Sequence, residues 1–264
     1  FAAARQRAVA ALLSSTDAAL LSAPNNTLGI EYCRALLRAG ASPELFTISR
    51  TGAAHDAAPE NAGGYSASAI RQLLAENRRA GALSRMVPAM RAAYETEEAA
   101  FRAPVFAAAC ERAILARLRS MTPADFDMLD TGHEGISQRL YNASRNAASL
   151  SAILDTAKTK RYAYARLRRM VLWAYLGLTP ADLPASVPYL RVLAANETGR
   201  TLLGRMRKTA YRPVITKPAA IRALSPDAQR LFALESRAAD LYTLAYPELT
   251  EACGSLWRQN PVML

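Results

Sequence analysis

The stretch PYLRVLAANETGRTLLGRMRKTAYRPVIT, residues 188–216, carries the clearest fold signal in the sequence. Its two ends, residues 188–193 and 212–216, are short apolar segments with strand character, and residues 198–208 between them have the periodicity of a helix. A strand, a helix and a second strand in this order form one β-α-β unit. This unit, at about residues 187–217, places the chain in the α/β class, although most of the remaining sequence is predicted to be helical.

The first 73 residues also alternate between helical and strand-like segments, in the order expected for the later part of a parallel α/β sheet. Helices are predicted over residues 3–14 and 28–39, and residues 45–48 (LFTI) are predicted to form a short buried strand. Residues 50–64 have the Gly, Ala, Pro, Asn and Asp composition of a loop. Loops of this length often bind or cover a ligand.

From about residue 80 the sequence becomes mainly helical. Two helix starts have proline at the first helical position and an acid in the first turn, at Thr122–Asp125 and Thr179–Asp182. A long helix is predicted to begin at Ser225. Its apolar stripe, which is expected to pack on the body, consists of Leu231, Leu234, Ala238, Leu241 and Ala245.

The composition is strongly basic. Thirty-three Lys and Arg against 22 Asp and Glu give a net charge of +11 over 264 residues, which points to a polyanionic partner. No apolar run approaches the ~20 residues that cross a bilayer, and the N-terminus lacks the layout of a signal peptide. We therefore expect a cytoplasmic protein with no membrane partner. The chain begins with Phe1 rather than Met, which suggests a fragment.

Several classes of site are excluded by the residues present. The three cysteines, Cys33, Cys110 and Cys253, are odd in number and far apart, which argues against a disulfide framework or a zinc site. They are expected to be small buried residues. The sequence contains no P-loop, HExxH, GxSxG or HxGH motif, so no catalytic residue and no metal site are assigned. The phosphate-binding half of any nucleotide site is expected to lie outside this chain.

The sharpest local feature is KTKRYAYARLRRM, residues 158–170, which is predicted to be one amphipathic helix. Its apolar face comprises Ala163, Leu167, Met170, Val171 and Ala174. The candidate nucleic-acid-binding residues are Lys158, Lys160, Arg161, Tyr162, Arg166, Arg168 and Arg169. Basic groups pair with phosphates, and a tyrosine among them can stack on an unpaired base. The alternative is a solvated face that binds nothing, but the net charge and the interleaved tyrosine favour RNA or DNA.

A second candidate pairs a predicted polar turn, Pro24-Asn25-Asn26, with Arg50 at the end of the next strand. Ligands of open α/β sheets bind beyond the carboxyl ends of the strands, so these groups could hold a nucleotide. Taken by themselves, the residues fit a helix cap and a surface arginine better.

The third candidate is the helix start from Ser66 to Arg71. Hydroxyls and free N–H groups at such a start can bind an anion, and either Ser66 or Ser68 can cap the helix. Any serine-capped helix looks similar, so this signal is weak. His55 and Asp56, in the preceding loop, are an acid/base pair or simply turn residues.

Several short motifs follow one another along the chain. They are PNNTLGIEY at residues 24–32, ISR at 48–50, Gly52 with His55 and Asp56, SASAIR at 66–71, HEGI at 133–136, KTKRY at 158–162, YLRVL at 189–193 and ITK at 215–217. Their order and spacing, over nearly the whole chain, resemble the tRNA(Met) cytidine acetate ligase family, nucleotidyltransferase-like proteins of the HIGH superfamily.

The resemblance implies an α/β fold that is mainly α by content. Residues 1–78 would be the C-terminal half of a nucleotidyltransferase-like Rossmann domain, and residues 79–264 a mostly helical tRNA-binding domain that includes the β-α-β unit.

The resemblance also implies that the protein is an ATP-dependent ligase. Such an enzyme activates acetate as acetyl-adenylate and then acetylates N4 of the wobble cytidine of elongator tRNA(Met). ATP would be a substrate, and Mg²⁺ would accompany it. The residues that match the ATP-binding motifs are Asn25, Asn26, Arg50, Ser66, Ser68 and Arg71. Residues 158–169 would face the tRNA.

The chain departs from the family in one respect, because the family's amino-terminal strand and HxGH motif are not in this sequence. The intact protein is therefore expected to be the ligase, and this chain alone is expected to bind tRNA weakly without catalysis. Two alternatives stay open: a catalytically inactive RNA-binding module and a small-molecule adenylyltransferase. The second would leave the basic segment without a purpose.

Overall fold

The computed structural model describes residues 7–21, 24–48, 66–130, 132 and 135–264. The chain divides into two compact units, residues 1–65 and residues 66–264, and each is described by itself. Helix α4 (Ala67–Ala75) packs on α5 (Arg79–Leu83) and belongs to the second unit. The division of the chain into domains at residue 78 stays a prediction.

The first unit differs from its predicted elements. Residues 7–10 are helical, but the helix predicted to reach residue 14 stops there, and α2 (Ser15–Leu20) follows it, with the Ser14 side chain accepting a hydrogen bond from the N–H of Asp17 at 3.1 Å. A second helix, α3 (Pro24–Arg38), begins four residues earlier than the predicted start at Leu28. Proline is well suited to a first helical turn, where its missing N–H costs nothing.

The buried strand predicted at residues 45–48 is wrong. This segment is extended, but it forms no ladder with any other described residue, and Phe46 and Ile48 are 82% and 96% exposed. A single extended segment cannot satisfy its backbone groups without a neighbouring strand, so apolar character alone does not make it a sheet strand.

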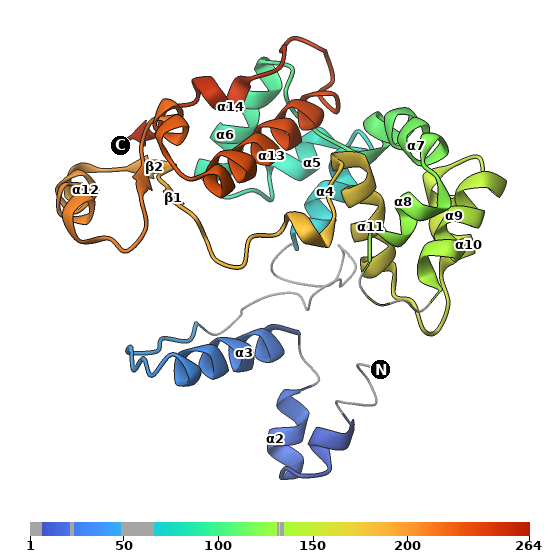
Figure 1. Ribbon diagram of the computed structural model, residues 1–264, viewed down its shortest axis with the longest axis horizontal. Coiled ribbons are helices and arrows are strands. Elements are labelled where there is room, and N and C mark those ends of the chain that lie inside the picture. The colour runs from blue at the N-terminus through green and yellow to red at the C-terminus, as the bar shows by residue number, and fades with distance from the viewer. Residues whose placement is uncertain (1–6, 22–23, 49–65, 131, 133–134) are drawn as a thin grey trace. The chain divides into compact units, whose positions relative to one another are not determined.

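The second unit is mainly helical. Its remaining helices are α6 (Pro88–Ala99), α7 (Glu111–Ser120), α8 (Pro123–Asp127), α9 (Ile136–Asn146), α10 (Leu150–Ala157), α11 (Tyr164–Leu176), α12 (Glu197–Thr209), α13 (Pro226–Thr243) and α14 (Ser255–Arg258). Short 3₁₀ helices lie at Ala107–Cys110, Pro180–Asp182 and Pro218–Ala223. Figure 1 shows α7–α10 at one end of this unit and α12 with β1 and β2 at the other end.

The predicted β-α-β unit is confirmed, with shorter strands. Strand β1 (Leu190–Arg191) pairs in parallel with β3 (Val214–Ile215), and α12 connects them. A second parallel pair, β2 (Ala194–Ala195) with β4 (Val262–Met263), brings the C-terminal segment to the same region. Two-residue strands so far apart in the sequence leave no periodicity, so the second pair gives no sequence signal.

Two apolar cores hold the second unit together. The larger core lies among α7–α11, where Leu118, Phe126 and Leu140 are completely buried. The smaller core joins the β-α-β unit to α13 through Ile215 and Phe232. The two helix starts with proline and an acid are confirmed, since the carboxylates of Asp125 and Asp182 accept hydrogen bonds from the N–H groups of Thr122 and Thr179.

Helix α13 begins where predicted, with Ser225 as its cap, but it buries a different face. Four residues of the predicted stripe are half-buried, namely Leu231, Leu234, Ala238 and Leu241, and the fifth, Ala245, lies past the end of the helix and is buried in the larger core. The buried side chains of α13 itself are Ala228, Phe232, Ser236 and Thr243. The Phe232 ring lies 6.5 Å from the Tyr189 ring and 4.6 Å from the Trp257 ring. These aromatic contacts orient the helix, and leucine spacing alone does not reveal them.

Candidate nucleic-acid interface and nucleotide-site residues

The basic segment at residues 158–170 is not one helix. Helix α10 ends at Ala157, residues 158–163 form a turn, and α11 begins at Tyr164. The Thr159 hydroxyl accepts hydrogen bonds from the N–H groups of Arg161 and Tyr162 at 3.2 and 3.1 Å. A threonine that satisfies backbone N–H groups in this way competes with helix formation, and this explains the difference from the predicted helix.

The structure corrects the role expected for Tyr162. Its side chain is 7% exposed and belongs to the larger core, so its ring has no face open to a base. Leu167, Met170, Val171 and Ala174 are buried as predicted, whereas Ala163 is exposed. The sequence predicts one apolar face for all five of these residues, and four of them form it.

The exposed aromatic residue of this region is Tyr164, which the sequence reasoning did not select. The Lys158 ammonium lies 5.3 Å and the Arg168 guanidinium 5.6 Å from the centre of its ring. Its hydroxyl donates to Asp155 Oδ1 at 2.5 Å, and this hydrogen bond raises the pKa of Tyr164. A ring fixed by a hydrogen bond and flanked by two cations is a suitable surface for an unpaired base beside phosphates.

Arg166 has a partner inside the protein. Its guanidinium donates to both carboxylate oxygens of Asp130, at 3.2 and 2.5 Å, and the two side chains are 25% and 11% exposed. Burial alone would raise the pKa of Asp130, but the hydrogen bonds from Arg166 and from the Gly132 N–H outweigh burial and lower that pKa. Arg166 therefore anchors the segment that contains Asp130 to α11.

The other candidates on this surface divide by exposure. Lys158 is half-buried, and its ammonium donates to the Thr159 carbonyl at 3.2 Å. Four basic side chains are exposed, namely Lys160, Arg161, Arg168 and Arg169. Together with Tyr164 they form what we call the α11 surface.

A shallow polar depression adjoins this turn, lined by Gln138, Asn142, Thr156 and Thr159 among others. The Gln138 amide donates to Asn142 Oδ1 at 2.9 Å, which orients both side chains on the outer face of α9. Amide groups of this kind can read base edges. These two residues were not among the predicted site residues, although their spacing of four residues, in a part of the chain predicted to be mainly helical, was available as a signal.

Only part of the predicted nucleotide site falls within the described residues. Asn25 and Asn26 are exposed and lie in the first turn of α3, not in the predicted turn before a helix. Arg50, His55 and Asp56 lie outside the described residues.

The predicted anion site at the start of α4 is described completely. The hydroxyl of Ser66 caps the helix by accepting from the Ala69 N–H at 3.2 Å, so Ser66 and not Ser68 is the cap. Ser68 and Arg71 are exposed on the helix. The structure therefore places two exposed side chains, a hydroxyl and a guanidinium, in the first turns of α4.

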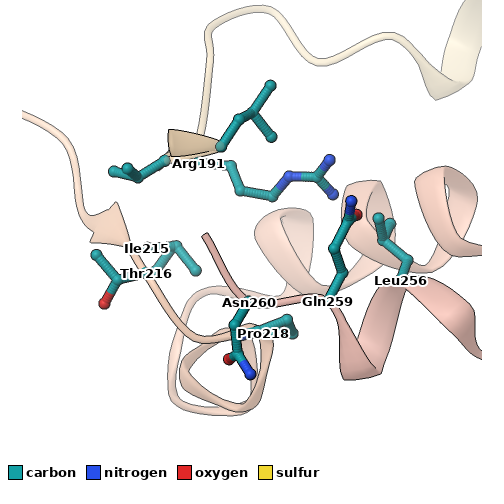
Figure 2. Close-up of a pocket in the computed structure, with 9 residues that line it drawn as sticks. Arg191, Ile215, Thr216, Pro218, Leu256, Gln259 and Asn260 are labelled. Atoms are coloured by element: carbon teal, nitrogen blue, oxygen red, sulfur yellow. The ribbon is translucent and has the colours of Figure 1, made fainter. Parts of the chain in front are cut away.

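The YLRVL motif at residues 189–193 lies beside a small pocket. Figure 2 shows the Arg191 side chain extending toward Gln259 and Leu256. Pro218 and Asn260, which also line the pocket, lie below Arg191 in this view. The pocket volume of about 20 Å³ suits a water molecule and not a nucleotide. Burial, together with the nearby Glu235 carboxylate, raises the pKa of Tyr189. An ion pair joins the Arg191 guanidinium to Glu235 Oε2, with 3.6 Å between nitrogen and oxygen. Tyr189 is buried in the smaller core, so this motif contributes to packing there.

The described ranges contain neither a cluster of metal ligands nor a membrane-spanning helix. Within them, no three His, Cys, Asp or Glu side chains lie close enough together to hold a metal ion. No helix of the part that the structure describes is long and apolar enough to cross a membrane. Cys110 is buried as expected, but Cys33 and Cys253 are exposed, which corrects the prediction for these two.

Comparison with known proteins identifies clear relatives. Residues 1–255 match the family model described as HIGH Nucleotidyl Transferase. A protein of Acetivibrio thermocellus named tRNA(Met) cytidine acetate ligase is 30% identical over 93% of this chain and 62% of its own length. Another protein of that name, from Alkaliphilus metalliredigens, is 32% identical over 86% of this chain and 55% of its own length. The chain thus spans between 55% and 62% of the length of these two relatives.

Two crystal structures of Thermotoga maritima TmcAL are also similar to this chain. The apo form has a TM-score of 0.90 at 24% identity over 99% of this chain and 66% of its own. The form bound with alpha-thio ATP has a TM-score of 0.88 at 25% identity over all of this chain and 66% of its own. The expected α/β, mainly helical fold and the resemblance seen in the sequence motifs are confirmed.

Proposed function

The chain belongs to the HIGH nucleotidyl transferase family, and from this premise we propose that the protein is an ATP-dependent ligase that acetylates a cytidine of tRNA(Met). The observation that carries the proposal is the fold shared, over the full chain, with a TmcAL structure that holds alpha-thio ATP. The names of the curated relatives supply the tRNA and the acetyl group.

The reaction would proceed in two steps. An acetate oxygen attacks the α-phosphorus of ATP, and pyrophosphate leaves as acetyl-adenylate forms. The N4 amine of the wobble cytidine in elongator tRNA(Met) then attacks the acetyl carbon, so that AMP leaves and the nitrogen loses a proton. Both steps develop negative charge on oxygen, so the protein's contribution would be positioning and charge stabilisation.

We assign the two substrates to different parts of the chain. The proposed ATP-binding residues are Asn25, Asn26, Arg50, Ser66, Ser68 and Arg71. Of these, Ser66 would act mainly as the helix cap that orients the other two groups of α4. Mg²⁺ would accompany ATP as a ligand of its phosphate oxygens.

The α11 surface is the proposed tRNA contact. Its four exposed cations can pair with phosphates, and Tyr164 replaces Tyr162 as the stacking residue. Lys158 would contribute through its contact with the Tyr164 ring, and Arg166 through its hold on Asp130.

The direct experiment is acetylation of purified tRNA(Met) with ATP and isotope-labelled acetate, followed by nucleoside analysis. The proposal predicts ATP-dependent label on the wobble cytidine when the chain is joined to an upstream segment that carries HxGH, and pyrophosphate released in equal amount. Label on another nucleoside, or none with the joined protein, would contradict it. Binding of tRNA without any product would favour the catalytically inactive RNA-binding module.

A further inference from the structure

Helix α12, Glu197–Thr209, presents basic side chains outward. Its inner face, half-buried against β2 and β3, contains Gly199, Leu203 and Met206. The four basic residues of the helix, Arg200, Arg205, Arg207 and Lys208, are all exposed. Arg207 and Lys208 follow Arg200 by seven and eight residues, which is about two helical turns. The three side chains therefore lie on the same exposed side of the helix.

This charge has no acidic counterpart in the described part of the chain, where none of the four basic side chains forms an ion pair. The only acid of α12 is Glu197, in the first turn, where it favours the N-terminal end of the helix. Helix α6 shows what an ordinary solvated helix does, because Arg91 pairs there with Glu95 at 3.1 Å. Helix α12 therefore has four basic side chains against one acid, and the described residues supply no ion-pair partner for the four.

Gly204 lies within the basic side of α12, between Arg200 and Lys208. A Cβ atom added at Gly204 would meet nothing within 4 Å, so no packing in this chain requires glycine there. Glycine inside a helix is less favourable than alanine, which makes it an unusual choice without a packing reason. A glycine on an exposed face lets another backbone approach the helix closely.

An exposed aromatic residue follows the helix directly. Tyr211 is 90% exposed, and the Arg212 guanidinium lies 4.7 Å from the centre of its ring. Arg212 is in turn held by a 2.9 Å hydrogen bond to Ser186 Oγ. The ring is thus supported on one face by a positioned cation, while most of its surface is open to solvent.

We propose that α12 and Tyr211 form a second RNA-binding surface, which we call the α12 surface. A phosphate backbone would run along Arg200, Arg207 and Lys208, approach closely at Gly204, and place an unpaired base on Tyr211. An anionic membrane suits this surface less well, because Leu203 and Met206 pack inward and Leu202, the one exposed large apolar side chain of α12, lies on the side of the helix away from Arg200 and Arg207. The identity of the RNA as tRNA rests on the proposed function, whereas the surface itself does not.

The α12 surface lies at the opposite end of the second unit from α7–α10 (Figure 1). It therefore does not extend the depression beside α9. A single RNA that reached both regions would be held at separate points, and this restricts its orientation more than either contact alone.

The first test measures RNA affinity by fluorescence anisotropy, with labelled tRNA(Met) and with oligo(U), at several salt concentrations. The variant Arg207→Ala/Lys208→Ala is compared with Arg78→Ala/Arg91→Ala, which removes two exposed, ion-paired arginines. We expect the α12 variant to lose affinity on the order of ten-fold and to lower the salt slope by roughly one to two. The control should change little, and equal affinities for the two variants would overturn the α12 surface.

The second test separates stacking from charge and from folding. Tyr211→Ala should weaken oligo(U) binding on the order of ten-fold, while Tyr211→Phe, which keeps the ring, should bind like the parent chain. Gly204→Ala should weaken RNA binding several-fold without lowering the thermal unfolding midpoint, whereas Gly29→Ala, an equally open helical glycine in α3, should not affect binding. A Gly204→Ala variant with unchanged RNA affinity would contradict the close approach.

The outcomes distinguish this surface from the proposed function. Equal affinity for tRNA(Met) and oligo(U), with no acetylated cytidine, would contradict the proposed function and leave the α12 variants to be judged on oligo(U). A parent chain that binds neither RNA would overturn the α12 surface. If the Arg207→Ala/Lys208→Ala variant lost binding to phosphatidylserine vesicles but kept the RNA affinity of the parent chain, α12 would be a membrane-binding surface. That result would also overturn the proposal.

Discussion

The pair of Asp130 and Arg166 shows how a residue from a charged run can be structural. The predicted tRNA contact is instead a 2.5 Å ion pair in which the carboxylate is 11% exposed. Removing one member would leave the other charge partly buried without its partner. We expect Asp130→Asn to lower the free energy of unfolding by about 2 kcal/mol at pH 7, as measured by urea denaturation. Asp127→Asn is the control, and an equal loss in both variants would contradict this role.

The same pair predicts a pH dependence of stability. The pKa of Asp130 is lowered in the folded protein, so its contribution is fully present above the unfolded pKa of about 3.9 and is lost as the pH falls through the folded value. The stability difference between the parent chain and Asp130→Asn should therefore be constant near neutral pH and shrink below about pH 4. Denaturation curves of both proteins across this range provide the check. A difference that grows on acidification would show that the sign is wrong.

Tyr164 makes a second prediction at the residue scale, because its ring and its hydroxyl serve different contacts. Tyr164→Phe removes the hydrogen bond to Asp155 but keeps the ring between its two cations, so tRNA affinity should be nearly unchanged. Tyr164→Ala removes the ring and should weaken tRNA binding on the order of five-fold or more. Anisotropy titrations would show this, and identical affinities for the two variants would exclude stacking on Tyr164.

At the scale of elements, the start of α4 offers two serines with different roles. Ser66 accepts the hydrogen bond from Ala69, whereas Ser68 is exposed one residue inside the helix. Ser66→Ala should lower the free energy of unfolding by about 1 kcal/mol, and Ser68→Ala should leave it within about 0.5 kcal/mol. Thermal and urea unfolding of both variants test this. A larger loss for Ser68→Ala would move the cap to that residue.

The elements also show what local sequence could and could not predict. Proline and an acid predicted helix starts correctly at Thr122 and Thr179, because a cap is satisfied within four residues. The segment at residues 45–48 had strand composition but no described partner, and pairing is decided outside the segment. The helix predicted over residues 158–170 begins only at Tyr164, because the Thr159 side chain accepts hydrogen bonds from backbone N–H groups and so makes a local alternative to the helix.

At the scale of the whole molecule, charge and fold were predictable to different degrees. The β-α-β unit and the surplus of basic residues could be read directly from the sequence, and the shared fold bears out the first. Which basic residues face solvent could not be read, because an ion pair such as Asp130–Arg166 joins residues 36 positions apart. Likewise, Tyr162 and Tyr164 are two residues apart, and only packing decides that the first is buried.

The net charge of +11 raises the question of whether RNA is held by particular residues or by overall charge alone. Two triple variants separate these possibilities, Arg161→Glu/Arg168→Glu/Arg169→Glu on the α11 surface and Arg34→Glu/Arg78→Glu/Arg91→Glu on exposed positions that form ion pairs. Each Arg→Glu change removes one positive charge and adds one negative charge, so the three changes lower the net charge from +11 to +5 in both variants.

If specific contacts dominate, the α11 variant should lose tRNA binding while its far-ultraviolet circular dichroism stays that of the parent chain, because its three side chains are exposed. The control should then retain most of its affinity, with a salt slope close to that of the parent chain. An equal loss in both variants would mean that tRNA responds only to net charge. The α11 surface would in that case have no role of its own, because the change in net charge, which is the same in both variants, would account for the loss.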